Sequence, residues 1–446
     1  MNNTSSSPSS RSQPSPSTVF EGVMLSPIIA EHIEKKPVLW LPESLENPFR
    51  FVIEEQGTWY DPSLNCYLKW IHPGDHVLDI GSDPGIYAVA AALKAGAQGQ
   101  VESIRLDALA QESLSLSCQE LPQLHSRLGD LTTEARIPNI DIIRVGAAAI
   151  DAEGGWLARH PEILENRPWL YFSIRNSEAW DTKHLEQLQL SAYQLGRYIP
   201  FIDALVPYDW SCITQYEPYC ANLFAVPKEH LNSWIEQGRW VEPKPLDRVP
   251  SPIVVAEQLK LWSPAYRELA EDYRDHAHPD TDMEELALGL AVQALNNASG
   301  ASMTDRLSDW QWSIQLLLLL IEKAPTVSRL LTLSRLLFEA GERAQALKHL
   351  ETIHAYFEAN HTILSHLFLS PDKEWDNHAP SESLDFATWL YSAVLDTWVK
   401  QRHLSAYTLD SEGEAVWQYL LDQNTLPESS VQAFALHKKR LAEQRL

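Results

Sequence analysis

The chain has 446 residues, of which 44% are hydrophobic, and 60 acidic against 35 basic residues give it a formal net charge of −25. This length predicts roughly two to three domains, and the apolar share suffices for an ordinary globular core. The acidic charge argues against a nucleic-acid partner and against anionic lipid surfaces, because binding to either requires a basic surface.

Cysteine usage and apolar segments indicate a reducing location. The four cysteines include no CxxC pair and no zinc-finger spacing, so neither a zinc site nor a disulfide framework is indicated. The N-terminal stretch MNNTSSSPSSRSQPSPS lacks the apolar core of a signal peptide. The longest apolar stretch, IQLLLLLIE from Ile314, is too short to cross a bilayer. We therefore expect a cytoplasmic protein without a membrane span.

The N-terminal half has the alternation of an α/β domain, predicted for residues 19–240. Residues 1–18 are Ser- and Pro-rich with little to bury, which predicts a disordered tail. Short β-branched runs at 76–81 and 140–145 are typical of strands buried on both faces. Further elements are a helix at 87–96 ending at Gly96, a strand at 169–174, a helix at 183–196 and a strand near the end of the sheet at 222–228.

The C-terminal half has a helical pattern. A Pro-rich linker at 241–256 precedes an all-α domain predicted for 257–446, where apolar residues recur at three- and four-residue spacing. The stretch 330–353 matches one tetratricopeptide unit, with Gly341 at the turn between its two helices. Any helical hairpin can imitate one such unit, so the number of repeats is left open.

The stretch VLDIGSDPGIY, residues 77–87, contains a glycine turn between a strand and a helix. Glycines let the backbone approach a ligand closely, and the amino end of the helix offers unpaired N–H groups. The Asp-x-Gly-x-x-x-Gly spacing differs from the dinucleotide GxGxxG and is more typical of loops that hold S-adenosylmethionine. A glycine turn that binds no ligand is the alternative interpretation.

Residues 47–101 closely resemble the start of FkbM-family methyltransferases, which have an EQ…DWF element before the pattern PG..VIDIGAN.G.YT. Residues 193–231 resemble the end of the same domain. The matching residues in the first stretch are Glu55, Gln56, Trp59, Tyr60, Pro73, Gly74, Asp79, Gly81, Gly85, Tyr87, Gly96 and Gly99. The resemblance implies an α/β Rossmann-like methyltransferase domain, S-adenosylmethionine as cofactor, and O-methylation of a sugar or glycan hydroxyl. It places cofactor binding at Asp79, Gly81, Ser82, Gly85 and Tyr87.

The chain departs from the family pattern at the end of the second strand. Family members have an acid there that takes the ribose hydroxyls, whereas Arg105 stands in its place. Asp107 follows two residues later and would point to the same side if the strand extends that far. We therefore include Asp107 among the candidate cofactor-binding residues.

A second departure concerns the catalytic strand. Family members read IDLIKIDVEG, whereas residues 140–154 read IDIIRVGAAAIDAEG. Aligning the strands places Gly146 at the family's aspartate and better preserves the length of the following helix. Aligning the tetrapeptide instead makes Asp151 and Glu153 the candidate catalytic residues. A methyl transfer to a hydroxyl needs a base, and only the second alignment places a carboxylate at that position.

Two functional hypotheses follow. The first is an FkbM-like, S-adenosylmethionine-dependent O-methyltransferase joined to a helical-repeat domain. The second is a catalytically inactive methyltransferase-like protein whose cleft persists as a binding surface and whose helical domain recruits a protein partner. A row of His and acidic residues at 276–284 could hold a divalent ion. A solvated loop broken by Pro279 is our preferred interpretation, so no metal site is predicted.

Overall fold

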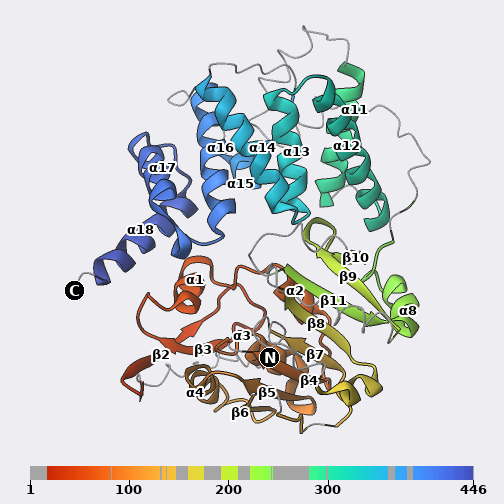
Figure 1. The fold of residues 1–446 in the computed structure, drawn as a ribbon, viewed down its shortest axis with the longest axis vertical. Coiled ribbons are helices and arrows are strands. Elements are labelled where there is room, and N and C mark those ends of the chain that lie inside the picture. Colours follow the sequence, from red (N-terminus) through yellow and green to blue (C-terminus); the bar gives the residue numbers. More distant parts are fainter. Residues whose placement is uncertain are drawn as a thin grey trace, which may run out of the picture.

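The computed structural model describes residues 18–81, 83–130, 133–136, 138–146, 159–174, 192–208, 221–242, 244, 281–297, 300–359, 367–378 and 385–444. These residues form an α/β part and, above it in Figure 1, an all-helical part. The predicted fold class is confirmed: a mostly parallel, Rossmann-like sheet is followed by an all-α region. The domain boundaries given above stay predictions.

The strands are β1 (Thr18–Phe20), β2 (Val23–Ile29), β3 (Val38–Pro42), β4 (His76–Gly81), β5 (Gln100–Arg105), β6 (Leu124–Leu128), β7 (Ile142–Val145), β8 (Trp169–Ile174), β9 (Tyr193–Ile199), β10 (Ala204–Pro207) and β11 (Ala221–Pro227). The helices of the α/β part are α1 (Pro48–Gln56), α2 (Ser63–Lys69), α3 (Ile86–Ala95), α4 (Ala108–Ser117) and α8 (Leu231–Glu236), with short 3₁₀ turns η1 (Gly96–Gln98), η2 (Pro161–Asn166), η3 (Pro200–Ile202) and η5 (Lys228–His230). The helical part contains α11 (Thr281–Leu295), α12 (Met303–Lys323), α13 (Val327–Glu339), α14 (Arg343–Glu358), α15 (Lys373–Asn377), α16 (Phe386–His403), η8 (Ala406–Thr408), α17 (Ser411–Asp422) and α18 (Glu428–Glu443).

The main sheet has eight strands in the order β10-β9-β11-β8-β7-β4-β5-β6, and β1–β3 form a separate antiparallel sheet. Strands β4 to β8 are parallel to one another, whereas β11 runs antiparallel to both β8 and β9. The strand predicted at 222–228 is confirmed as β11, the third strand from the β10 edge of the sheet. Because β5 and β7 flank β4, the strand order reverses at β4, and ligand crevices of open α/β sheets form at the carboxyl ends of strands at such a point.

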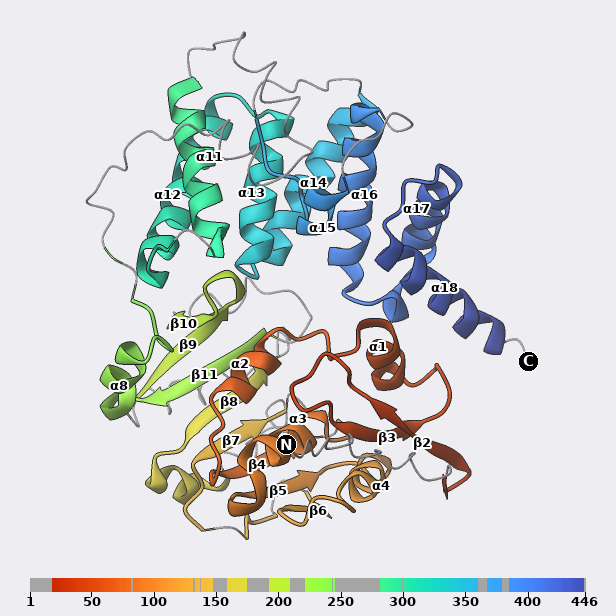
Figure 2. The same cartoon turned by 180° about the vertical axis from the view of Figure 1, so that it is seen from behind.

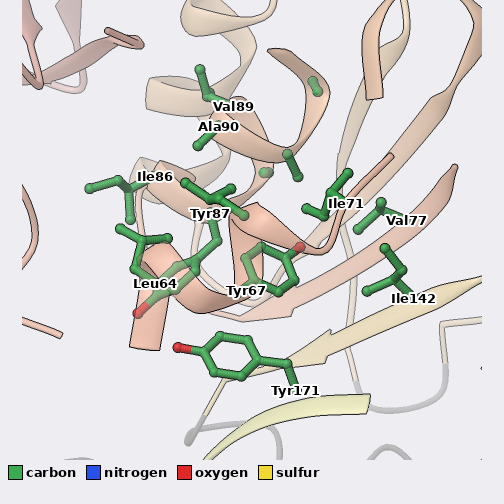
Figure 3. Packing of buried hydrophobic residues seen from close by; sticks show 14 of the residues in the cluster. Leu64, Tyr67, Ile71, Val77, Ile86, Tyr87, Val89, Ala90, Ile142 and Tyr171 are labelled. Atoms are coloured by element: carbon green, nitrogen blue, oxygen red, sulfur yellow. The ribbon is translucent and has the colours of Figure 1, made fainter. Parts of the chain in front are cut away.

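Both faces of the central strands are buried, which explains their continuous apolar runs. Val77 and Ile142 lie in the cluster that includes α2 and α3, whereas Leu78 and Ile143 lie in a second cluster with Ile163 of η2. Figure 3 shows the first of these clusters, with Tyr67 and Tyr171 among its labelled residues. The predicted strand at 76–81 and the helix ending at Gly96 are confirmed as β4 and α3.

The predicted helix at 183–196 is wrong at its carboxyl end, because Tyr193–Ile199 forms β9. Residues 183–191 lie outside the described part of the chain. Tyr193, Leu195 and Ile199 are buried, and their spacing by even numbers suits a strand. β9 pairs with both β10 and β11, so this pairing outweighs the local helical pattern.

The helical hairpin predicted at 330–353 is confirmed as α13 and α14. Leu333, Leu337 and Leu350 are buried in its core, and Gly341 adopts a left-handed φ of +81° at the turn. The assignment of this hairpin as a tetratricopeptide repeat stays a prediction. In the described part of the chain, no helix combines the length and apolar character needed to cross a membrane.

The helical part packs against the α/β part through α1, as both views show (Figures 1 and 2). Phe51 shares a hydrophobic cluster with Trp417 and other residues of α16, α17 and α18. The carboxylate of Glu55 accepts hydrogen bonds from the Ser405 hydroxyl and from the Ala406 amide at 2.8 Å. Gln56 Nε2 donates to the Leu404 carbonyl at 2.7 Å. The EQ pair of the family pattern therefore serves here as a contact between the two parts.

A second contact lies at the carboxyl end of β9. Arg306 of α12 donates to the Phe201 carbonyl at 2.5 Å, and Arg197 pairs with Glu342 at the α13–α14 turn. Both β9 and β8 run antiparallel to β11, so the end of β9 lies at the same edge of the sheet as the ends of β4, β5 and β7. The helical part therefore packs onto the edge where a ligand of this fold would bind.

Candidate functional site

Three charged side chains meet where β4, β5 and β7 end. Asp79 of β4 is the register partner of Arg144 on β7, and Arg105 on β5 pairs with Gly81. Alternation along the strands places all three on the face that also carries Val77, Val101 and Ile142. That face is covered by α3. Neighbouring strands therefore bring together residues that are distant in the sequence.

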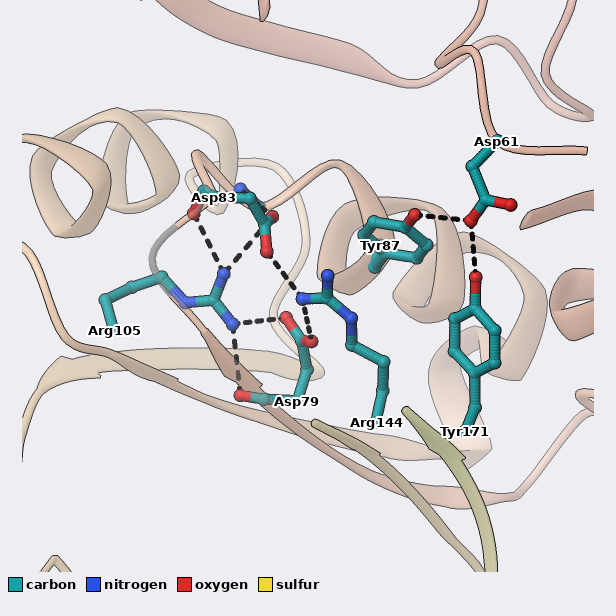
Figure 4. Close-up of polar contacts among 8 residues, drawn as sticks. Asp61, Asp79, Asp83, Tyr87, Arg105, Arg144 and Tyr171 are labelled. Carbon is teal, nitrogen blue, oxygen red and sulfur yellow. Dashed lines mark hydrogen bonds and ion pairs between the residues drawn. The ribbon is translucent and has the colours of Figure 1, made fainter. Parts of the chain in front are cut away.

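The three side chains and Asp83 of the glycine turn form one cluster, shown in Figure 4. Asp79 Oδ2 pairs with Arg105 Nη2, and Asp79 Oδ1 accepts from Arg144 Nη1 at 3.0 Å. Asp83 Oδ2 accepts from Arg144 Nη1 at 2.5 Å, while Asp83 Oδ1 lies 3.3 Å from Arg105 Nη1. Two acids and two arginines therefore neutralise one another, and both oxygens of each carboxylate are engaged.

The cluster lies inside the protein. The side chains of Asp79 and Arg105 are 0% exposed, that of Arg144 is 5% exposed and that of Asp83 is 10% exposed. Burial alone would raise the pKa of the Asp83 carboxyl, but the guanidinium groups of Arg144 and Arg105 hold it well below its usual range. Burial would likewise lower the pKa of Arg144, and the carboxylates of Asp83 and Asp79 raise it instead. Asp83 and Arg144 are thus charged at neutral pH.

A second buried network adjoins the cluster. The Arg144 guanidinium lies 3.9 Å from the centre of the Tyr87 ring, and the Tyr87 hydroxyl donates to Asp61 Oδ2 at 2.9 Å. Tyr171 donates to the same oxygen at 2.6 Å, and Ser63 Oγ donates to Asp61 Oδ1 at 2.6 Å. Burial, followed by the negative charge of Asp61, raises the pKa of both tyrosines. The hydroxyl of Tyr87, a residue predicted to bind cofactor, is therefore hydrogen-bonded to Asp61.

Asp61 was missed by the sequence analysis. Its Oδ1 also accepts from the Ser63 amide at 2.9 Å, which is the bond of an Asx-turn, and an Asp before a Pro is a recognisable signal for such a turn. Nothing in the sequence spacing indicates that Tyr87 and Tyr171, 26 and 110 residues away, reach the same carboxylate.

The glycines of the turn contact protein atoms rather than an open crevice. A Cβ on Gly81 would lie 3.0 Å from Arg144 Nη1 and 3.1 Å from Asp83 Oδ2. At Gly85, which has a φ of +97°, a Cβ would lie 2.5 Å from Leu114 Cδ1 of α4. A Cβ on Gly146, directly after β7, would lie 3.3 Å from the Gly81 Cα. Close packing within the chain therefore accounts for a glycine at each of these positions.

Of the remaining candidate residues, the structure describes Asp107, which is not part of this cluster. β5 ends at Arg105, so the extension on which the role of Asp107 depends does not occur. Asp107 is instead the N-cap of α4, and its Oδ1 accepts from the Ala110 amide at 2.8 Å. Ser82, Asp151 and Glu153 lie outside the described residues.

These residues do not fit S-adenosylmethionine in the arrangement observed. A nucleoside bound at this edge needs an acceptor for its ribose hydroxyls at the end of the second strand, and Arg105 supplies only donors. The acids that could face the cofactor's cationic groups, Asp79 and Asp83, are already paired with arginines.

Two other features lie apart from the cluster. Among the described residues, no group of three or more His, Cys, Asp or Glu side chains is arranged to hold a metal ion, and the row at 276–284 lies largely outside the described residues. Within that row, Glu284 pairs with Arg329.

A surface pocket of about 430 Å³ is lined by Gln100, Glu102, Leu124, His125, Ser126, Arg127 and Arg136. Glu102 and Arg105 are three positions apart on β5, so their side chains lie on opposite faces of the sheet. The pocket that Glu102 lines is therefore separate from the Arg105 cluster.

No protein-family model matches this chain, and no curated protein matches it either. Among solved structures, the chain is similar to a SAM-dependent methyltransferase from Aquifex aeolicus, with 16% identity, 41% of this chain and 94% of that chain covered, and a TM-score of 0.30. It is also similar to a TehB-like SAM-dependent methyltransferase from Corynebacterium glutamicum, with 15% identity, 40% and 94% covered, and a TM-score of 0.31. A third is Aeropyrum pernix fibrillarin in complex with natively bound S-adenosyl-L-methionine, with 14% identity, 48% and 99% covered, and a TM-score of 0.28.

Proposed function

We propose that this chain is a catalytically inactive methyltransferase-like protein that acts by binding, with the helical domain recruiting a protein partner. The observation that supports the proposal is the neutral cluster of Asp79, Asp83, Arg105 and Arg144 at the carboxyl edge of the sheet. The cluster is buried and both oxygens of each carboxylate are paired with a guanidinium group, whereas Nε of Arg105 and Nε of Arg144 have no hydrogen-bond partner among the described residues. A site kept for a cationic ligand would instead leave a carboxylate unpaired toward the space that the ligand enters.

Two features of the helical part support a role in recruitment. It is joined to the α/β part by a shared hydrophobic cluster and by hydrogen bonds at α1 and β9, so it forms a fixed extension of the sheet. It also exposes large apolar side chains: Leu318 and Leu319 of α12 are 49% and 53% exposed, and Tyr419 of α17 is 48% exposed. Because the whole chain has a net charge of −25, a partner with a basic surface would associate fastest.

The competing candidate is an S-adenosylmethionine-dependent O-methyltransferase acting on a sugar or glycan hydroxyl. It is favoured by the glycine turn between β4 and α3, which lies at the point where the strand order reverses. Membership of the FkbM family and a cytoplasmic location likewise remain predictions. In this candidate, Asp151 and Glu153 would be the first residues to test as bases.

Calorimetric titration of the full chain with S-adenosylmethionine and with S-adenosylhomocysteine distinguishes the two functions. We expect no heat of binding and no thermal shift up to millimolar ligand, with an established methyltransferase as positive control. Micromolar binding by the unmodified chain would contradict the proposal and support the enzyme. Affinity capture with the helical part intact, compared with a variant carrying Leu318→Glu and Leu319→Glu, then tests whether that surface contributes to partner binding.

A further inference from the structure

The Arg105 side chain crosses the carboxyl edge of the sheet from β5 to the glycine turn after β4 (Figure 4). Its Nη1 donates to the Asp83 carbonyl at 2.9 Å, and its Nη2 donates to the Asp79 carbonyl at 3.1 Å and pairs with the Asp79 carboxylate. The side chain is 0% exposed. One guanidinium group thus fills the space between two strand ends and also satisfies backbone carbonyls there.

That space is where an open α/β sheet of this strand order holds the ribose of a nucleoside ligand, whose hydroxyls donate to an acid at the end of the second strand. Arginine has five donors and no acceptor. Arg105 therefore occupies the ribose position and at the same time reverses the hydrogen-bonding character of the site.

We propose that Arg105 is an internal substitute for a nucleoside ligand, and that its donors occupy the position where the ribose hydroxyls would need an acceptor. The inference rests on the proposed function, because it explains why the unmodified chain would not bind cofactor. It predicts that replacing Arg105 with an acceptor lets this edge of the sheet bind a cationic nucleoside.

The rest of the cluster would keep the edge in place after Arg105 is replaced. Arg144 contacts both Asp79 and Asp83 and also packs on the Tyr87 ring. The Asp83 side chain is further held by the Gly85 amide, which donates to its Oδ1 at 2.9 Å. Without Arg105, Arg144 would therefore still hold Asp83 of the glycine turn to β7.

Charge determines which ligand the opened site would prefer. The present cluster is neutral, with two arginines against two aspartates. In an Arg105→Glu variant, one arginine would face three carboxylates, an excess of two negative charges. S-adenosylmethionine carries a positively charged sulfonium group that S-adenosylhomocysteine lacks. The Arg105→Glu variant should therefore bind S-adenosylmethionine more tightly than S-adenosylhomocysteine.

The test compares the full-length wild type with Arg105→Glu and Arg105→Gln, using equilibrium dialysis with labelled S-adenosylmethionine and thermal shift with both ligands. Arg105→Gln adds a carbonyl acceptor without a charge, so it remains informative if the glutamate variant does not fold. The matched control is Arg127→Glu, which reverses the charge of an arginine bound to Glu102 on the other face of the sheet. Circular dichroism establishes which variants are folded.

We expect at least tenfold tighter binding of S-adenosylmethionine in a folded Arg105 variant than in the wild type or in Arg127→Glu, with S-adenosylhomocysteine weaker in Arg105→Glu. Folded Arg105 variants that bind neither ligand, or failure of both variants to fold, would overturn the inference, since the edge would then need Arg105 itself. Binding by the wild type would instead overturn the proposed function, so the two failures are distinguishable.

Discussion

Replacing Asp79 with alanine tests whether this carboxylate serves the fold or a ligand. In the structure, Asp79 is fully buried and paired with both Arg105 and Arg144. Its removal leaves two buried arginines facing Asp83 alone, an uncompensated positive charge. Breaking a buried ion pair from one side costs about 3–5 kcal/mol. For an α/β part of this size, each kcal/mol shifts Tm by about 2–4 °C, so a fall of about 6–20 °C is expected.

The assay is thermal and urea unfolding followed by circular dichroism at neutral pH. Glu31→Ala is the control, because it removes an ion-paired carboxylate from the surface of the same domain, where both side chains are 50% exposed. Such a pair contributes about 1 kcal/mol or less. The Asp79→Ala shift should persist in about 1 M salt, because buried pairs are screened far less than exposed ones.

A ligand-binding role for Asp79 leads to the opposite result. Residues that serve a ligand are often neutral or unfavourable for stability in its absence. A Tm within about 2 °C of the wild type would therefore refute the reasoning. So would a double-mutant cycle with Asp79→Leu and Arg105→Leu that showed no coupling, because contacting charged residues should couple by about 0.5–3 kcal/mol.

Three further outcomes are expected. Gly85→Ala should lower stability by about 1–3 kcal/mol in urea unfolding, because a left-handed φ of +97° and the Leu114 side chain both oppose a Cβ; an unchanged midpoint would contradict this packing. Asp107→Ala should cost about 1 kcal/mol as a lost N-cap, with no effect on any ligand titration, and an effect on binding alone would restore its predicted role at the cofactor. Burial raises the pKa of the Glu55 carboxyl, so its contribution to stability is fully present below an unfolded pKa of about 4.3 and is lost as the pH rises through the folded value. As the pH rises from 4 to 8, the free energy of unfolding of the wild type should therefore fall relative to that of Glu55→Gln. If the two free energies instead changed in parallel with pH, Glu55 would not become a buried charge at its contact with Ser405.

The sequence by itself determined the features that depend on local pattern. Continuous apolar runs specify β4 and β7, small residues followed by Gly96 specify α3, and three- and four-residue periodicity specifies the helical hairpin around Gly341. The departure at Arg105 was also visible, because the resemblance to the FkbM pattern aligns Arg105 with the family's acid at the end of the second strand. These signals are local: each depends on side chains within one strand, helix or turn.

Only the tertiary structure decided what the charged residues do. Arg144 meets Asp79 because β7 pairs with β4 in one register, across 65 residues of sequence. Glu55 meets Ser405 across 350 residues. Tyr193–Ile199 becomes a strand because β10 and β11 pair with it. Periodicity shows which face of an element is apolar, but not which element lies beside it, and an unpaired charge becomes a buried ion pair only through that choice of neighbour.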